Sequence, residues 1–67
     1  MKVYILELSY DYEGIREILK VFSSGSKAVI YTEQYIKESK DKWIYCKNNT
    51  WENPTQSLHI YEMEVEE

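Results

Sequence analysis

The chain has 67 residues, a formal net charge of −4, one cysteine and one histidine. A domain of this length is close to the lower limit at which one hydrophobic core suffices, and an oligomer is a common source of extra stability. A single cysteine cannot form an intrachain disulfide. One cysteine and one histidine are also too few ligands for a structural zinc site. The acidic balance and the eight scattered basic residues argue against a nucleic-acid-binding surface. We therefore expect one domain over residues 1–67 with no cofactor.

The start of the chain does not fit a signal peptide, because Glu7 interrupts its apolar run. No apolar stretch approaches the roughly 20 residues of a membrane helix. A lone thiol suits a reducing compartment. We expect a cytoplasmic protein that does not enter the membrane.

The first predicted element is a strand over residues 2–10, which is rich in aliphatic and aromatic residues. Its even-numbered apolar residues, from Tyr4 to Tyr10, share one face, whereas Val3 and Ile5 lie on the other. Apolar residues on both faces predict a strand in the interior of a sheet rather than at its edge.

Residues 11–14 predict a turn, and the segment that follows allows two interpretations. Ile15, Ile18, Leu19 and Phe22 have helical spacing. The segment is short for a stable helix, however, and its second half also suits a strand. We favour the strand.

The serine-rich segment 23–26 breaks the chain and offers caps for a helix that runs to about Lys40. The stripe expected to face inward consists of Ala28, Tyr31, Tyr35 and Ile36. Val29 and Ile30 lie outside the centre of this stripe. They belong either to a wide apolar face at the rim of the core or to a contact patch for another chain.

The remaining pattern is a strand over residues 43–46, a polar loop over 47–56 and a last strand over 57–65, with an acidic end at 64–67 that frays. The predicted fold class is α+β: a four-stranded, largely antiparallel sheet with one helix on one face, in the order ββαββ. One helix can cover only one face of a sheet. The apolar residues left on the second face predict a homodimer.

Few residues are candidates for chemistry. On its own strand, His59 has no acid beside it on the same face, so we expect a structural or surface role for it. Cys46 lies in a strand between Tyr45 and Lys47, whereas a reactive thiol needs an electropositive site or a helix N-terminus, so we expect a structural role for it as an ordinary buried or half-buried residue. Residues 23–27 resemble part of a phosphate-binding turn at a helix start, but they lack the glycine spacing of such loops, and capping is favoured. We expect no enzymatic activity.

The aromatic content, seven tyrosines and two tryptophans, supplies either buried core area or binding anchors. Trp51 lies in the polar loop, where it can fold back to close the core or stand out as an anchor. The candidate protein-binding residues are Val29, Ile30, Trp43, Tyr45 and Trp51.

Three segments carry a resemblance to a known family. They are the opening at residues 2–13, the step from Val21-Phe22-Ser23-Ser24 into a helix with Ala28, and the acidic and aromatic alternation of residues 60–65. Together they resemble a family of small, uncharacterised bacterial and phage ββαββ proteins. The chain departs from that pattern in the apolar residues 29–31 of its helix and in an extra aromatic strand and loop.

The resemblance implies no catalytic activity, and it favours a strand over residues 15–22. Phage proteins of this size often bind a host protein and block it. By this analogy the first expectation is a non-enzymatic protein-binding module, most concretely a phage-encoded inhibitor of a host antiviral defence system that acts in the host cytoplasm.

Two other functions stay open. One is a small-ligand or nucleotide-binding protein that sequesters its ligand at the helix entrance, residues 23–27, or between protomers. The other is a structural phage or bacterial protein. The expected partners are a host protein and a second copy of the chain, without nucleic acid or membrane.

Overall fold

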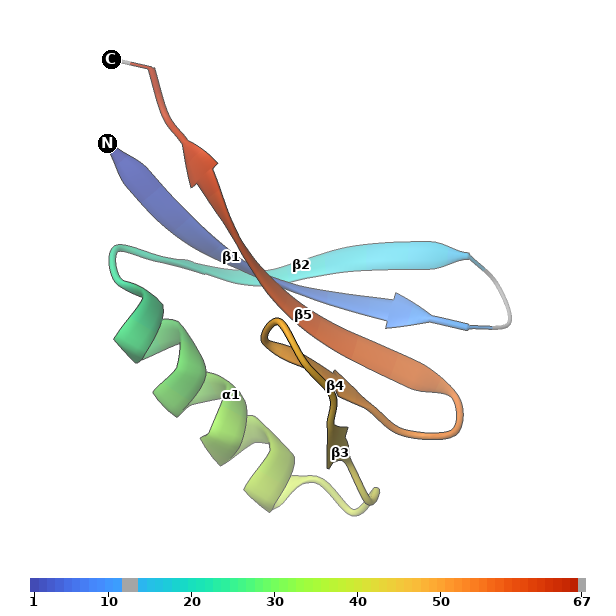
Figure 1. Cartoon of the computed structure of the whole chain (residues 1–67). Coiled ribbons are helices and arrows are strands. Elements are labelled where there is room, and N and C mark those ends of the chain that lie inside the picture. The colour runs from blue at the N-terminus through green and yellow to red at the C-terminus, as the bar shows by residue number, and fades with distance from the viewer. Residues whose placement is uncertain (12–13, 67) are drawn as a thin grey trace.

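The computed structural model describes residues 1–11 and 14–66 of the chain. The elements in chain order are β1 (Lys2–Tyr10), β2 (Ile15–Phe22), α1 (Gly25–Glu38), β3 (Ile44–Tyr45), β4 (Thr50–Glu52) and β5 (Gln56–Glu64). All strand pairs are antiparallel, and the sheet has the order β2-β1-β5-β4-β3 with α1 against one side (Figure 1). The α+β class with one helix is confirmed.

The predicted number of strands is wrong, because the sheet has five strands rather than four. The predicted loop at 47–56 contains β4, in which Trp51 pairs with Leu58 of β5. The chain reverses before β4 through Asn48 and Asn49, whose φ angles are 59° and 54°. Asparagine enters this left-handed region more readily than most residues that carry a side chain. The two asparagines therefore form the turn of a hairpin, where the polar composition alone predicts a loop.

β1 lies in the interior of the sheet, as its apolar residues on both faces predict. It pairs with β5 from Lys2 opposite Glu64 to Tyr10 opposite Gln56, and its other edge pairs with β2. These three strands form the main part of the sheet, since β3 and β4 contain only two and three residues.

β2 confirms the strand interpretation of residues 15–22 and contains a bulge. Leu6 lies opposite Lys20, whereas the next residue, Glu7, lies opposite Ile18, so Leu19 is the extra residue of the bulged strand. The bulge keeps Leu19 among the side chains packed against the core. It also leaves Ile18 on the opposite face, with Glu7.

α1 begins where the serines predict a cap. The Ser24 Oγ accepts a hydrogen bond from the backbone N–H of Lys27 at 3.1 Å, so Ser24 is the N-cap. The helix ends at Glu38, close to its predicted end, and the Ser39 N–H donates to the Ile36 carbonyl at 3.1 Å. The predicted turn at 11–14 and the predicted frayed end extend into residues 12, 13 and 67, which lie outside the described residues.

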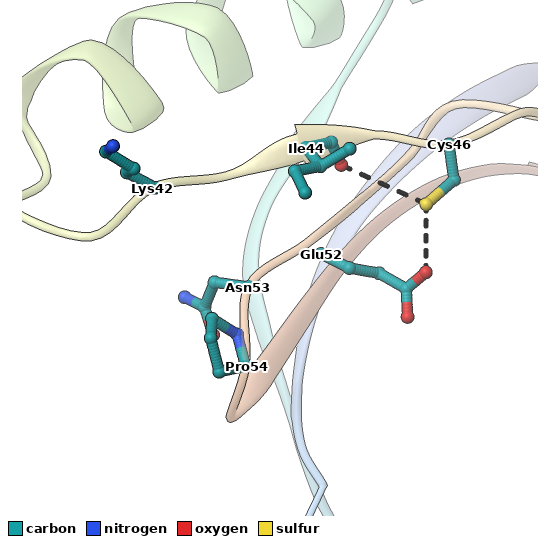
Figure 2. Close-up of a pocket in the computed structure, with 6 residues that line it drawn as sticks. All are labelled: Lys42, Ile44, Cys46, Glu52, Asn53 and Pro54. Atoms are coloured by element: carbon teal, nitrogen blue, oxygen red, sulfur yellow. Dashed lines mark hydrogen bonds between the residues drawn. The ribbon is translucent and has the colours of Figure 1, made fainter.

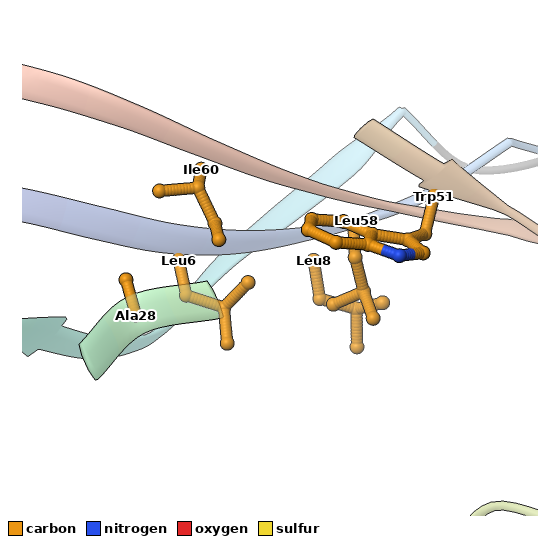
Figure 3. Packing of buried hydrophobic residues seen from close by; sticks show 6 residues of the cluster. All are labelled: Leu6, Leu8, Ala28, Trp51, Leu58 and Ile60. Atoms are coloured by element: carbon orange, nitrogen blue, oxygen red, sulfur yellow. The ribbon is translucent and has the colours of Figure 1, made fainter. Parts of the chain in front are cut away.

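The core lies between α1 and the sheet face that carries the even-numbered residues of β1. Its buried apolar side chains are Leu6, Leu8, Ala28, Trp51, Leu58 and Ile60 (Figure 3). The predicted inward stripe of α1 packs against this cluster. Thr32 is also fully buried, and its hydroxyl is satisfied because Oγ1 donates to the Ala28 carbonyl at 2.8 Å. Trp51 is only 7% exposed, so it folds back into the core.

Trp51→Ala is expected to lower the free energy of unfolding by about 3–5 kcal/mol, because it empties part of the core. A domain of this length has a total stability of roughly 3–10 kcal/mol, so the variant should be close to unfolding. Urea denaturation followed by circular dichroism measures the change. The matched control is Tyr45→Ala: its ring contacts the Trp51 ring edge-on, with centroids 5.2 Å apart, but is largely exposed. The control should lose about 1 kcal/mol. Equal urea midpoints for Trp51→Ala and the wild type would contradict the assignment of Trp51 to the core.

Candidate protein-binding surfaces

The sheet face away from α1 has no second layer over it within residues 1–11 and 14–66 (Figure 1). Strand alternation and register gather apolar side chains there. This open-face patch consists of Val3, Ile5, Ile18, Val21, Tyr61 and Met63. Ile18, Val21 and Met63 are 57%, 52% and 49% exposed. Ile5, at the centre of the patch, is 5% exposed, so its neighbours shield it while most of the patch faces outward.

A polar row borders the open-face patch. His59 lies opposite Glu7 of β1 and opposite Thr50 of β4. Its Nδ1 is 2.7 Å from the Thr50 Oγ1, and its ring stacks on Tyr61. The Arg16 Nη1 lies 4.0 Å from the Glu7 Oε1. The sequence pattern does not indicate that Glu7 is a neighbour of His59, because only the register between β1 and β5 brings the two residues together.

A pocket of about 430 Å³ lies at the β3–β4 end of the sheet (Figure 2). The Cys46 thiol donates a hydrogen bond to the Glu52 Oε2 at 2.9 Å. This hydrogen bond is the main reason that the pKa of Cys46 is raised, and desolvation and the negative charge of Glu52 act in the same direction. A thiol that stays protonated is a weak nucleophile. The arrangement agrees with the structural role expected for Cys46.

A second depression, which we call the β2–α1 groove, lies on the helix side of the sheet. It has a volume of about 460 Å³ and is lined by Lys20, Phe22, Lys27, Ile30, Tyr31 and Gln34. The Phe22 and Tyr31 rings contact each other with centroids 5.3 Å apart. The Lys20 Nζ lies over them, 4.8 Å from the Tyr31 centroid and 6.0 Å from that of Phe22. Both charged residues of the groove are lysines, although the chain is acidic overall.

The five candidate contact residues do not lie on one surface. Trp51 is in the core, and Val29 is half-buried against it. Trp43 is also half-buried, and its indole N–H donates to a serine hydroxyl at 3.2 Å. Tyr45 on β3 and Ile30 on α1 are mostly exposed, and Ile30 lines the β2–α1 groove.

At the helix entrance, residues 23–27, the Ser24 hydroxyl caps the helix by accepting a hydrogen bond from the backbone N–H of Lys27. A pocket of about 470 Å³ lies beside it, bounded by apolar or aromatic side chains that include Tyr4, Val29 and Ile60. No charged side chain lines this pocket among the described residues. The pocket beside the entrance therefore offers a phosphate no cationic side chain, since Lys27 lines the β2–α1 groove instead, and the structure agrees with the capping interpretation.

Within residues 1–11 and 14–66, no three histidine, cysteine, aspartate or glutamate side chains gather where they could hold a metal ion. In the same part of the chain, no helix has the length and apolar character needed to cross a membrane. Comparisons of the chain with protein-family models, curated proteins and solved structures give no match. The resemblance to small bacterial and phage proteins stays a prediction. The open-face patch and the β2–α1 groove are therefore the basis for inferring a function.

Glu52→Gln is expected to lower the pKa of Cys46 toward its ordinary value, because the variant removes the carboxylate that accepts the thiol proton. The thiolate fraction at mildly alkaline pH should rise, so iodoacetamide should alkylate Cys46 faster than in the wild type. The pH dependence of the alkylation rate, followed by mass spectrometry, measures the shift. Glu62→Gln removes the same charge at an exposed site outside the pocket of Cys46 and should leave the pH dependence of the alkylation rate unchanged. Identical profiles for Glu52→Gln and the wild type would contradict the assigned hydrogen bond.

Proposed function

We propose that the chain is a non-enzymatic protein-binding module that holds an extended, acidic segment of another protein along β2 and in the β2–α1 groove. One observation carries this proposal: a lysine-lined groove with an exposed apolar residue lies beside a free sheet edge, in a chain with a net charge of −4.

The sheet edge supports an extended ligand. β2 is the outermost strand, and among the described residues only β1 pairs with it. Its eight residues therefore present one row of backbone N–H and C=O groups to a further strand. Addition of a strand from another protein to such an edge is a common mode of peptide recognition. At the other end of the sheet, β3 has only two residues and offers much less pairing.

The charges of the groove support an acidic ligand. The ion pairs within residues 1–11 and 14–66 use the Met1 amino group, Lys2 and Arg16, and none of them uses Lys20 or Lys27. Carboxylates of a bound segment would supply the missing partners. Exposed ion pairs contribute about 0–1 kcal/mol each, so strand pairing would supply most of the affinity and the lysines most of the selectivity.

The exposed apolar surface supports a segment that also carries apolar side chains. Ile30 is 66% exposed and lies at the groove with the Phe22 and Tyr31 rings. In a strand, alternate side chains point to the same side, so a segment with regular alternation can place every second residue in the groove.

In its most specific form, the proposal makes the chain a phage-encoded inhibitor of a host antiviral defence system that works by direct contact in the host cytoplasm. The sequence resemblance motivates this form. The acidic segment would then belong to the host complex.

A synthetic peptide whose groove-facing positions alternate between glutamate and valine, with threonine at the positions between them, is expected to bind along β2, because it combines strand-forming residues with negative charge. In an NMR titration, the amide signals of residues 15–22 and of the lysines in the groove should shift. The same peptide with lysine in place of every glutamate should leave these signals unshifted. Equal shifts with both peptides would contradict the predicted charge selectivity.

The double variant Lys20→Glu, Lys27→Glu is expected to bind the glutamate peptide at least about tenfold more weakly, a change of about 1.4 kcal/mol. Lys37→Glu, Lys47→Glu makes the same change in net charge outside the groove and should retain binding. Fluorescence anisotropy with a labelled peptide measures both. Equal affinities of the two double variants for the peptide would overturn the assignment of the binding site to the β2–α1 groove. Displacement of the peptide by inorganic phosphate would favour a small-anion site and also overturn the proposal.

A further inference from the structure

We infer that a second copy of this chain covers the open-face patch, so that the two sheets stack face to face around Ile5. The inference goes beyond the proposed function, because it concerns the opposite face of the sheet and a different partner.

The exposed apolar side chains around Ile5 favour a second layer on this face. A sheet with apolar side chains on both faces needs a layer against each, and α1 covers only the side of Leu6 and Leu8. Ile5 is already as inaccessible as the residues of the core, yet Ile18, Val21 and Met63 around it remain about half exposed. A second layer would remove these three side chains from water at about 25 cal/mol per Å² of apolar surface.

The accessible surface of the chain is larger than that of a compact monomer of the same mass. A compact monomer of this mass has an accessible surface of about 4,500 Å². The chain exposes 5087 Å². The excess of about 600 Å² agrees with the extended shape of the chain, 38 × 24 × 19 Å. Each partner of a standard interface contributes roughly 800 Å². The radius of gyration, 12.1 Å, also exceeds the value of about 11 Å typical of a compact domain of this length.

The charges around the open-face patch favour a second copy as the occupant. No residue of the patch is charged, and at its border Arg16 lies 4.0 Å from Glu7 and pairs with it. A twofold interface brings the same surface of both copies together and therefore has to be complementary to itself. An uncharged apolar face meets this condition, whereas unpaired like charges would repel each other. Stacked sheets of this kind lie about 10 Å apart.

The two proposed surfaces can be used at the same time. Along β2, Ile18 and Val21 lie on the open face, whereas Lys20 and Phe22 line the β2–α1 groove. A face-to-face dimer would leave both grooves exposed, so it could bind two segments of one partner or of two partners with an avidity that a monomer lacks.

Size-exclusion chromatography with light scattering tests the dimer. At micromolar concentration the wild type should have twice the 8.1 kDa mass of one chain. Met63→Lys and Val21→Lys each place a charge between the stacked sheets, so both should be monomers with native circular dichroism. The control Ile15→Lys makes the same kind of change at a half-exposed side chain opposite Tyr10, on the helix side of the sheet and outside the open-face patch, and should stay dimeric.

Two results would overturn the inference: a wild type that is monomeric at micromolar concentration, or a dimer that persists in both Met63→Lys and Val21→Lys. Met63 lies on β5 and not on β2, so its substitution separates face stacking from pairing of two β2 edges. Should the lysine variants unfold, a mixture of labelled and unlabelled wild type decides the question. Intermolecular NOEs between the methyl groups of Ile5, Val21 and Met63 are expected, and their absence overturns the inference. Folded Met63→Lys should still bind the glutamate peptide, so a failure of the dimer is distinguishable from a failure of the proposed function.

Discussion

A single helix of 14 residues lies against a five-stranded sheet, and it can cover only one side. This constraint determines where the core lies and which surfaces remain for binding. The side chains under α1 form the buried cluster, while the opposite face retains the open-face patch. The groove lies where the surface of α1 meets the helix face of β2. Both proposed interactions therefore follow from the way in which one helix covers the sheet.

The long pairing of β1 with β5 maintains this division between the two faces. Leu6 and Leu8 point to the core and Ile5 to the open face, and a slip of one residue in the register would exchange them. Such a slip would bury polar residues under α1, so the hydrophobic pattern strongly favours the observed register. The bulge in β2 has a comparable effect, because it holds Leu19 in the core and leaves Ile18 on the open face.

The groups that could perform chemistry are engaged in contacts within the described part of the chain. The Cys46 thiol is kept protonated by Glu52, and the His59 ring is held by Thr50. In contrast, the lysines of the β2–α1 groove have no carboxylate partner among the described residues, and in that same part of the chain no layer covers the open-face patch. This contrast supports contact with other chains as the function that we propose.

Local signals in the sequence were sufficient for most of the fold. The serine cap, the apolar stripe of the helix, the central position of β1 and the surplus of apolar side chains on its second face are all visible there, because caps and periodicity depend on near neighbours. β4 was missed because a strand of three residues is defined by its pairing with β5 and by burial of Trp51, which are both non-local. For the same reason, only the tertiary structure brought Lys20 beside Tyr31 and Glu7 opposite His59. The sequence alone thus determined the helix, the long strands β1, β2 and β5, and the surplus of apolar side chains on one face of the sheet. Strand register and helix packing decided which side chains meet, since these depend on contacts between residues far apart in the chain.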